Sequence, residues 1–176
     1  MIPAPMIAVE RATGEDIPFL LATERLPGYE AFIGRSDEAM HRARLEDPRQ
    51  AVFLARDGAQ RAGFAILRGW DSEDGITLLM RIAMAEPGLG HGRAFLAGLM
   101  ERVFTETRCH RFWLGQFPDN ARARHVYETA GFVAEGIARG NVFLDGRHHD
   151  ELILAILRPD WLAQLGAGRR GSGPEG

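Results

Sequence analysis

The sequence lacks several features that would assign it to a large class of proteins. It contains a single cysteine, Cys109, which excludes a disulfide within the chain and indicates a reducing compartment. It has no run of about 18 apolar residues, so a membrane-spanning helix is not expected. The formal net charge of −3 argues against binding to nucleic acid or to an anionic membrane through bulk charge. No basic segment followed by an apolar one opens the chain, so we expect no signal peptide and a cytoplasmic location.

Lysine is absent altogether, and all 21 basic residues are arginine. This absence excludes the phosphate-binding loop of nucleoside triphosphatases, which needs a lysine and a Ser or Thr after its glycines. Gly88, Gly90 and Gly92 are spaced GxGxG, so the GxGxxG fingerprint of dinucleotide-binding proteins is missing as well. The two most familiar glycine-rich nucleotide loops are therefore excluded.

The segment before these glycines is strongly apolar. Residues 76–84 are apolar almost throughout, which predicts a strand covered on both faces. The glycine-rich turn at residues 87–92 follows, and then apolar residues recur at helical spacing as far as Phe104. The sequence thus predicts a buried strand, a turn and an amphipathic helix.

The start of this helix lacks the residues that usually cap one. No Ser, Thr, Asp or Asn occurs between Glu86 and Thr105, although these residues normally bind the first free N–H groups of a helix. Small residues around Gly90 and Gly92 let a ligand approach this backbone, and the helix dipole favours an anion there. The segment is consistent either with a phosphate site or with a turn that holds only water.

A length of 176 residues suits one domain with a sizeable core, which we place at residues 1–165. Residues 166–176 are rich in Gly and Arg, so a disordered tail is expected there. Periodicity and turn signals predict strands at residues 6–11, 51–56, 62–70, 76–84, 111–116, 135–144 and 150–157. Helices are expected from about residue 13 or 16, from Ser36, after the glycine turn and from about Asn120. The order β-α-α-β-β-β-α-β-α-β-β predicts a three-layer α/β fold with helices on both sides of a mixed sheet.

This order equals that of the GCN5-related N-acetyltransferase (GNAT) family, and two segments resemble the family's motifs. The turn PGLGHG resembles its acyl-CoA pyrophosphate loop, [QR]xxGx[GA], with Gly90 and Gly92 in place and Pro87 where Gln or Arg is usual. Residues 119–132, DNARARHVYETAGF, resemble the pattern N-x-x-[AS]-x-x-x-[YF]-[EK]-x-x-G-F of ribosomal-protein and polyamine N-acetyltransferases. The residues that match this pattern are Asn120, Ala123, Tyr127, Glu128, Gly131 and Phe132. The resemblance covers residues 50–157.

The resemblance implies an acetyl-CoA-dependent N-acetyltransferase with a mostly antiparallel sheet. Such an enzyme transfers an acetyl group to a primary amine by direct attack in a ternary complex and needs no metal. The acceptor is a protein N-terminus, a polyamine, an amino acid or an antibiotic, and a homodimer is common in the family. The alternative is a non-catalytic acyl-CoA-binding sensor or partner module, which Pro87 and the lack of an obvious general base would favour.

The resemblance also assigns residues to the cofactor. In the family, the strand before the glycine loop separates from its neighbour, and the pantetheine arm pairs with the exposed backbone. The backbone groups implied for pantetheine and the thioester carbonyl are those of Ile82, Ala83 and Met84. The backbone N–H groups implied for the pyrophosphate are those of Leu89, Gly90, His91, Gly92 and Arg93. Asn120 would contact the pantetheine arm, although its position also suits the N-cap of a helix.

Tyr127 is the candidate catalytic residue. It follows Asn120 by seven residues, about two helical turns, so both lie on nearly the same face of one helix. A phenol there would act as a general acid that protonates the departing sulfur. The alternative is a buried aromatic residue whose hydroxyl binds a backbone carbonyl. Arg122 and Arg124 either contact CoA phosphates or form a solvated helix face.

Other charged residues leave alternatives open. The general base is one of six carboxylates or a water, and the carboxylates are Glu24, Glu30, Asp71, Glu73, Asp74 and Glu151. Arg81 interrupts an apolar strand, so it either faces an acidic group of the acceptor or forms an internal ion pair. His148, His149 and Asp150 are adjacent in the sequence, and adjacent residues on a strand point to opposite faces, so no metal site is expected there.

Overall fold

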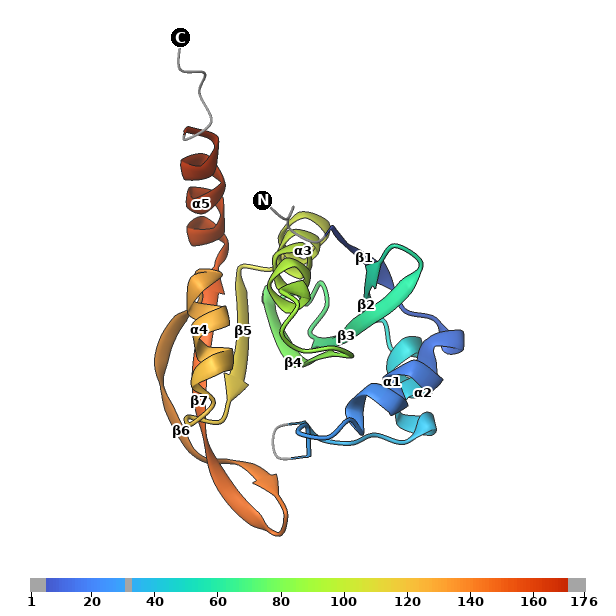
Figure 1. Cartoon of the computed structure of the whole chain (residues 1–176). Coiled ribbons are helices and arrows are strands. Elements are labelled where there is room, and N and C mark those ends of the chain that lie inside the picture. Colours follow the sequence, from blue (N-terminus) through green and yellow to red (C-terminus); the bar gives the residue numbers. More distant parts are fainter. Residues whose placement is uncertain (1–5, 31–32, 171–176) are drawn as a thin grey trace.

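The computed structural model of the chain describes residues 6–30 and 33–170 (Figure 1). Its strands are β1 (Ile7–Arg11), β2 (Gln50–Asp57), β3 (Gln60–Arg68), β4 (Ile76–Met84), β5 (Arg111–Gln116), β6 (Val133–Leu144) and β7 (Arg147–Leu157). They form one sheet in the order β1-β2-β3-β4-β5-β7-β6. Only the β4–β5 pair is parallel among the pairings of the described residues, so the predicted mixed, mostly antiparallel sheet is confirmed.

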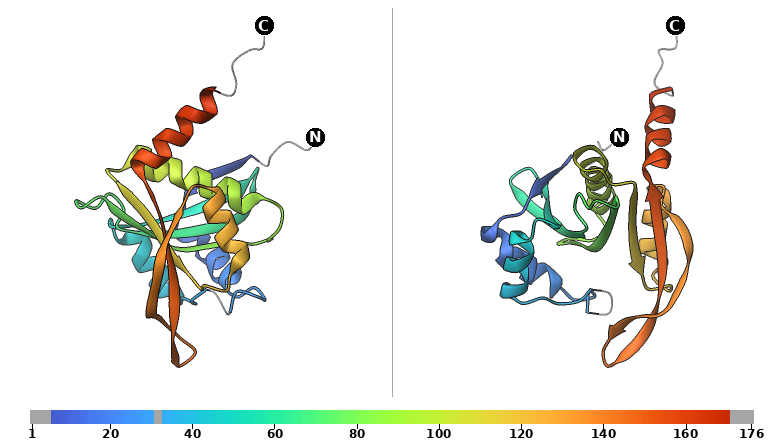
Figure 2. Two further views of the ribbon diagram at one scale, coloured as in Figure 1. Left: turned by 90° about the vertical axis from the view of Figure 1, so that its left-hand side faces the viewer. Right: turned by 180° about the vertical axis from the view of Figure 1, so that it is seen from behind.

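Helices cover both faces of this sheet, as the predicted three-layer fold requires (Figures 1 and 2). The helical elements are the 3-10 turn η1 (Gly14–Asp16), α1 (Ile17–Glu24), α2 (Glu38–Glu46), α3 (His91–Glu106), α4 (Ala121–Thr129) and α5 (Arg158–Arg170). The larger core joins α3 to one face and contains Phe95, Leu99 and Phe112. A second core joins α1 to the other face and contains Leu20 and Phe64. The apolar alternation of each strand therefore supplies two separate hydrophobic layers.

The start of the second helix differs from the sequence prediction. The second helix was predicted to open at Ser36, but Asp37 is the N-cap of α2, and its carboxylate accepts a hydrogen bond from the Met40 N–H at 2.7 Å. Ser36 is buried instead, with its hydroxyl accepting from Arg44 at 2.7 Å. Both residues are good caps, so the local sequence does not separate them.

Helix α5 was not predicted, and it includes residues 166–170 of the segment for which we expected a disordered tail. Pro159 and Asp160 lie in its first turn, where a fixed proline φ and an acidic side chain both suit a helix start. Trp161 is buried against Phe104 with ring centroids 5.2 Å apart, which fixes the beginning of the helix. From there α5 leads away from the sheet (Figure 2). Residues 171–176 lie outside the described part of the chain.

Candidate active site

The strands β4 and β5 separate on the side of the glycine turn. They pair at Ile76↔Arg111, Thr77↔Phe112 and Leu78↔Trp113, and within the described residues no pairing between them continues beyond Leu78. Past this point β5 pairs with β7 alone, while β4 stays paired with β3. The rest of β4 therefore presents an open edge toward β5.

The alternation of a strand decides which backbone groups face this opening. Ala85 donates its N–H to the Ala62 carbonyl of the β3 side at 2.8 Å. Because successive residues direct their N–H and C=O groups to opposite edges, Ala83 faces β3, whereas Ile82 and Met84 face the opening. The predicted pantetheine contacts through Ile82 and Met84 fit this geometry, and the contact through the Ala83 backbone does not.

The glycine turn leads from this edge into the bare start of α3. Gly90 is the N-cap with φ +78°, and no side chain in the described chain caps it, as the sequence predicts. A Cβ at Gly90 would meet no atom within 4 Å, so its glycine is required by the left-handed backbone and not by crowding. The free N–H groups of this turn are thus exposed to an anionic ligand.

The remaining residues predicted for the pyrophosphate lie in the same turn. Leu89 and Arg93 are exposed, with Leu89 keeping 55% of its surface accessible. His91 places its Nε2 atom 3.5 Å from the Asp57 carboxylate, so its side chain faces the β2–β3 turn. For Gly92, a Cβ would lie 3.6 Å from Met84 Cγ, an ordinary contact. The structure therefore brings these backbone groups together, and their role in cofactor binding stays a prediction.

The two arginines near the start of α4 have different surroundings. An Arg122 guanidinium nitrogen lies 3.7 Å from the point where a Gly88 Cβ would sit, so its charge lies beside the glycine turn. Arg124 donates instead to Glu128 at 2.8 Å on an exposed helix face. The phosphate-binding alternative is thus geometrically open to Arg122, while Arg124 belongs to the solvated face.

Asn120 begins α4 as its N-cap. Its side-chain oxygen accepts from the Ala123 N–H at 3.1 Å, which confirms the capping role considered from the sequence. The side-chain NH₂ group is not used by this bond and remains able to donate to a ligand.

Tyr127 lies in α4 with its ring packed against the larger core. Its ring meets Phe132 at 6.0 Å between centroids in a T-shaped arrangement. Its hydroxyl makes no hydrogen bond with any described residue, so the alternative of a bond to a backbone carbonyl is not found. Burial, together with the nearby Tyr29 phenol, raises the pKa of Tyr127 to about 12. This phenol therefore keeps its proton at any pH where proteins normally work.

Tyr29 is a further residue of this site that the sequence analysis did not identify. It follows α1, and its hydroxyl lies 2.8 Å from both the N and the O atom of Met84 on the open edge of β4. The two residues are 55 positions apart in the chain. No local pattern reports a contact over such a separation.

Glu24 is one of the six base candidates, and it is held in a buried charged cluster. It is fully buried and forms an ion pair with Arg81, which confirms the internal partner considered for that arginine. The Glu24 Oε2 atom accepts from the Ser36 N–H at 3.0 Å. His41 Nε2 lies 3.2 Å from Oε1, the oxygen that also meets Arg81. Burial alone would raise the pKa of Glu24, but His41, the Ser36 N–H and Arg81 outweigh it and lower that pKa. Glu24 is therefore a fixed anion with no free path to a substrate.

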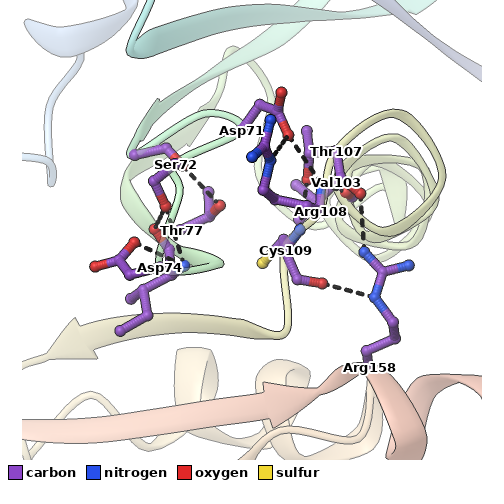
Figure 3. Close-up of polar contacts among 11 residues, drawn as sticks. Asp71, Ser72, Asp74, Thr77, Val103, Thr107, Arg108, Cys109 and Arg158 are labelled. Atoms are coloured by element: carbon purple, nitrogen blue, oxygen red, sulfur yellow. Dashed lines mark hydrogen bonds and ion pairs between the residues drawn. The ribbon is translucent and has the colours of Figure 1, made fainter.

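Three further candidates lie in the turn between β3 and β4, at the opposite end of β4 from the glycines. Figure 3 shows the Asp71 carboxylate turned toward Arg108, whose N–H donates to it at 2.9 Å. Asp74 accepts from the Ile76 N–H at 3.4 Å, and Glu73 is exposed in the same turn. Their pairing and their position make all three unsuited to the chemistry at the open edge of β4.

Glu151 of β7 is a candidate that lies beside the unpaired part of β5. A Cβ at Gly115 of β5 would lie 2.0 Å from the Glu151 carboxyl carbon, so the carboxylate occupies the space that this glycine leaves. Gly115 lies beyond Trp113, the last β5 residue that pairs with β4. Glu151 also accepts from the Asn141 side chain at 2.6 Å, but no ion pair is found for it among the described residues. Glu30, by contrast, is bound at 2.7 Å to the Gly28 N–H.

Metal and membrane features were searched over residues 6–30 and 33–170. No group of three or more His, Cys, Asp or Glu side chains is placed to hold a metal ion. No helix in the same residues is long and apolar enough to cross a membrane.

The site described so far can be compared with known proteins. The sequence profile of the Acetyltransferase (GNAT) family matches residues 20–132. This chain belongs to that family. The match covers the second half of α1, the separated strands, the glycine turn and α4, so the family resemblance drawn from the sequence is confirmed.

Individual relatives carry the same description. "Probable N-acetyltransferase YjcK" of Bacillus subtilis is 44% identical over 62 residues, which are 35% of this chain and 34% of the relative. The spermidine N(1)-acetyltransferase of Vibrio cholerae is 32% identical over 81 residues, 46% of this chain and 47% of the relative. The matches thus span about a third and about half of the length of these two relatives.

Solved structures extend the similarity of the fold to most of the chain. The spermidine N-acetyltransferase of Vibrio cholerae in complex with CoA and spermine has a TM-score of 0.79 at 20% identity. The alignment covers 89% of this chain and 98% of that one. At this identity the likeness establishes the fold and leaves the substrate to be argued from the site.

Proposed function

We propose that this protein is an acetyl-CoA-dependent N-acetyltransferase that acetylates a primary amine. One observation carries the proposal. The open edge of β4 runs directly into the uncapped start of α3, and α4 presents a phenol without a hydrogen-bond partner in the described chain, Tyr127. An extended amide chain that ends in a diphosphate matches the edge and the helix start together.

The residues fit the parts of acetyl-CoA in order along this path. The pantetheine arm would pair with Ile82 and Met84, and the Asn120 side-chain NH₂ would donate to the same arm. The pyrophosphate would lie on the N–H groups of residues 89–93, near the Arg122 guanidinium. Arg122 would thereby supply, from α4, the cation that Pro87 does not provide at the first position of the loop.

The chemistry then needs two proton transfers. The amine nitrogen attacks the thioester carbonyl and forms the C–N bond, after which the C–S bond breaks and the amine loses a proton. Tyr127 donates a proton or hydrogen bond to the departing sulfur. Glu151, beside the opening, takes the amine proton directly or through one water. The fixed anions Glu24 and Asp71 take no part.

Primary amines of the polyamine type are the acceptors we favour, because the spermidine N-acetyltransferases are similar to this chain in sequence and fold. A cytoplasmic location, with the buried free Cys109 kept reduced, and a homodimer complete the proposal.

The test measures release of free thiol from acetyl-CoA in the presence of spermidine, a peptide with a free N-terminus, an amino acid or an aminoglycoside. Turnover with any of them supports the enzyme, and the Glu151→Gln variant should then lose about 10²-fold in kcat/KM. Tight CoA binding without turnover would support the sensor. Absence of both binding and turnover would contradict the proposal.

A further inference from the structure

The Tyr29 hydroxyl bonds to a backbone position that a ligand would be expected to use. The Met84 N–H donates to the hydroxyl oxygen, and the hydroxyl donates to the Met84 carbonyl, both at 2.8 Å. One side chain therefore satisfies both backbone groups that this residue turns toward the opening. Met84 is the last residue of β4 and comes directly before the glycine turn.

These contacts satisfy two backbone groups that would otherwise lack hydrogen-bond partners. An N–H and a C=O on the edge of a buried strand must find partners, since an unsatisfied buried group costs about 1–3 kcal/mol. The neighbouring strand β5 is not there to provide them, because its pairing with β4 ends at Leu78. Tyr29 thus supplies the pair of bonds that a neighbouring strand would otherwise supply.

The surroundings of Tyr29 place it among the groups of the proposed reaction. Its ring packs on the second core, and its carbonyl accepts from the Ile33 N–H at 2.8 Å. Burial raises the pKa of Tyr29, the bond to the Met84 carbonyl and the Arg122 charge act against this rise, and Tyr29 itself adds to the raised pKa of Tyr127. The hydroxyl therefore lies on Met84, at the start of the glycine turn, and within electrostatic range of the predicted catalytic phenol.

We propose that the Tyr29 hydroxyl occupies the place on Met84 that an amide of the pantetheine arm takes, so that acyl-CoA displaces it on binding. This inference rests on the proposed function, because it assumes that acyl-CoA lies along β4. A secondary amide carries one N–H and one C=O, the same complement that the hydroxyl offers to Met84. Displacement also frees a phenol next to Tyr127 and couples residues 27–30 to the presence of the cofactor.

If the Tyr29 hydroxyl competes with the cofactor for Met84, its removal should strengthen CoA binding. A purely structural role of the hydroxyl would not have this effect. Tyr29→Phe keeps the ring in its packing and removes the oxygen that competes with the cofactor. CoA affinity should then rise about fivefold, the equivalent of one net hydrogen bond of about 1 kcal/mol. If the hydroxyl instead helped to build the cofactor site, its removal would weaken binding.

The first experiment titrates CoA into Tyr29→Phe and the wild type and follows the heat of binding. The matched control is Tyr127→Phe, which loses the same atom from a ring whose hydroxyl makes no hydrogen bond to Met84, and its CoA affinity should stay within twofold of wild type. An unchanged or weaker affinity of Tyr29→Phe overturns the inference.

A second experiment follows CoA binding in the wild-type chain and needs a variant only to assign its signals. The sequence contains two tyrosines, so carbon-13 labelling at the tyrosine Cζ gives two signals, which the Tyr127→Phe protein assigns. The Tyr29 signal should shift with CoA and saturate at the calorimetric Kd. CoA binding with no shift at Tyr29 overturns the displacement alone. Failure of the wild type to bind CoA overturns the proposed function, and the displacement with it.

Discussion

Two neighbouring regions of this protein are built from different parts of its chemistry. The region proposed for the cofactor consists mainly of backbone groups, namely the open edge of β4, the glycine turn and the uncapped start of α3. The other region, where α1, α2 and β4 meet, consists of buried charged side chains, with Glu24, Arg81 and His41 in contact. The glycine turn of the first region is exposed to solvent, whereas the second region is closed to it.

The difference teaches where each region tolerates change. A site made of N–H groups depends on backbone conformation, so Pro87 alters one side-chain contact and leaves the others in place. A buried ion pair depends on each partner, because removing one leaves a charge without compensation. Substitutions should therefore affect ligand binding in the first region and folding stability in the second.

The largest effect is expected from Tyr127→Phe. This variant tests whether a single side chain is also important for activity in the region that consists mainly of backbone groups. If proton transfer to sulfur counts, kcat should fall about 10²–10⁴-fold while acetyl-CoA binding is nearly retained. Steady-state kinetics and calorimetry separate the two quantities. An unchanged kcat removes Tyr127 from the mechanism.

The pH profile of the wild type sharpens this point. Because the pKa of Tyr127 is raised to about 12, the phenol is protonated at all lower pH values. The rate should rise with pH up to about pH 10, because the alkylammonium group of the acceptor has an ordinary pKa of about 10, and no decline is expected in that range. A decline with an apparent pKa near 9 that is absent from Tyr127→Phe would contradict this assignment.

The next effect concerns stability. Glu24→Gln should lower the free energy of unfolding by about 3–5 kcal/mol, because Arg81 would remain buried without its anion. Urea unfolding measures the change. The matched control is Glu38→Gln, which removes an exposed ion pair with Arg42 and should cost under about 0.5 kcal/mol.

The sign of the pH dependence follows from the lowered pKa of Glu24 in the folded state. Its stabilising contribution is present above the unfolded pKa of about 4.3 and is lost as the pH falls through the lower folded value. The stability difference between wild type and Glu24→Gln should therefore shrink below about pH 4. A constant difference down to pH 2 would contradict the buried ion pair.

Gly92→Ala should weaken ligand binding without destabilising the fold, whereas Glu24→Gln should destabilise the fold. The Cβ added at Gly92 meets Met84 Cγ at an ordinary 3.6 Å, so the fold should gain up to about 1 kcal/mol in stability from the stiffer chain. CoA affinity should fall about tenfold if a diphosphate lies against this backbone. In Gly90→Ala the φ of +78° costs stability as well. Undiminished CoA binding by Gly92→Ala would place the diphosphate elsewhere.

The smallest effect is expected from Arg122→Gln. Loss of one partly solvated cation near the glycine turn should weaken CoA binding about fivefold at low salt and less at high salt. Arg124→Gln is the matched control, since its guanidinium pairs with Glu128 on the exposed face. Equal affinities for both variants would remove Arg122 from the proposed phosphate site.

The sequence was sufficient wherever one segment decides its own structure. The apolar run of β4 and the missing cap before α3 are both local properties. Asn120 as the N-cap of α4 belongs to the same group. These features fixed the order of elements and the position of the glycine turn.

The rest could not be predicted because it depends on contacts between distant segments. Tyr29 reaches Met84 and Glu24 reaches Arg81 across more than fifty positions each. Helix α5 depends on the burial of Trp161 against Phe104, which overrides the glycines that suggested disorder. Tertiary packing decided these three features, and no periodicity in the sequence reports it.

The separation of β4 from β5 has a mechanical consequence for the whole molecule. In the described chain, three residue pairs of β4 and β5 are the backbone pairing that joins the two halves of the sheet, β1 to β4 and β5 to β6. Beyond these pairs, each half keeps its own hydrogen-bonded ladder, so the halves are able to rock against each other with little loss of bonding. A long, amide-bearing ligand bound in the gap would restrict this movement. The protein without ligand should therefore be the more flexible of the two forms.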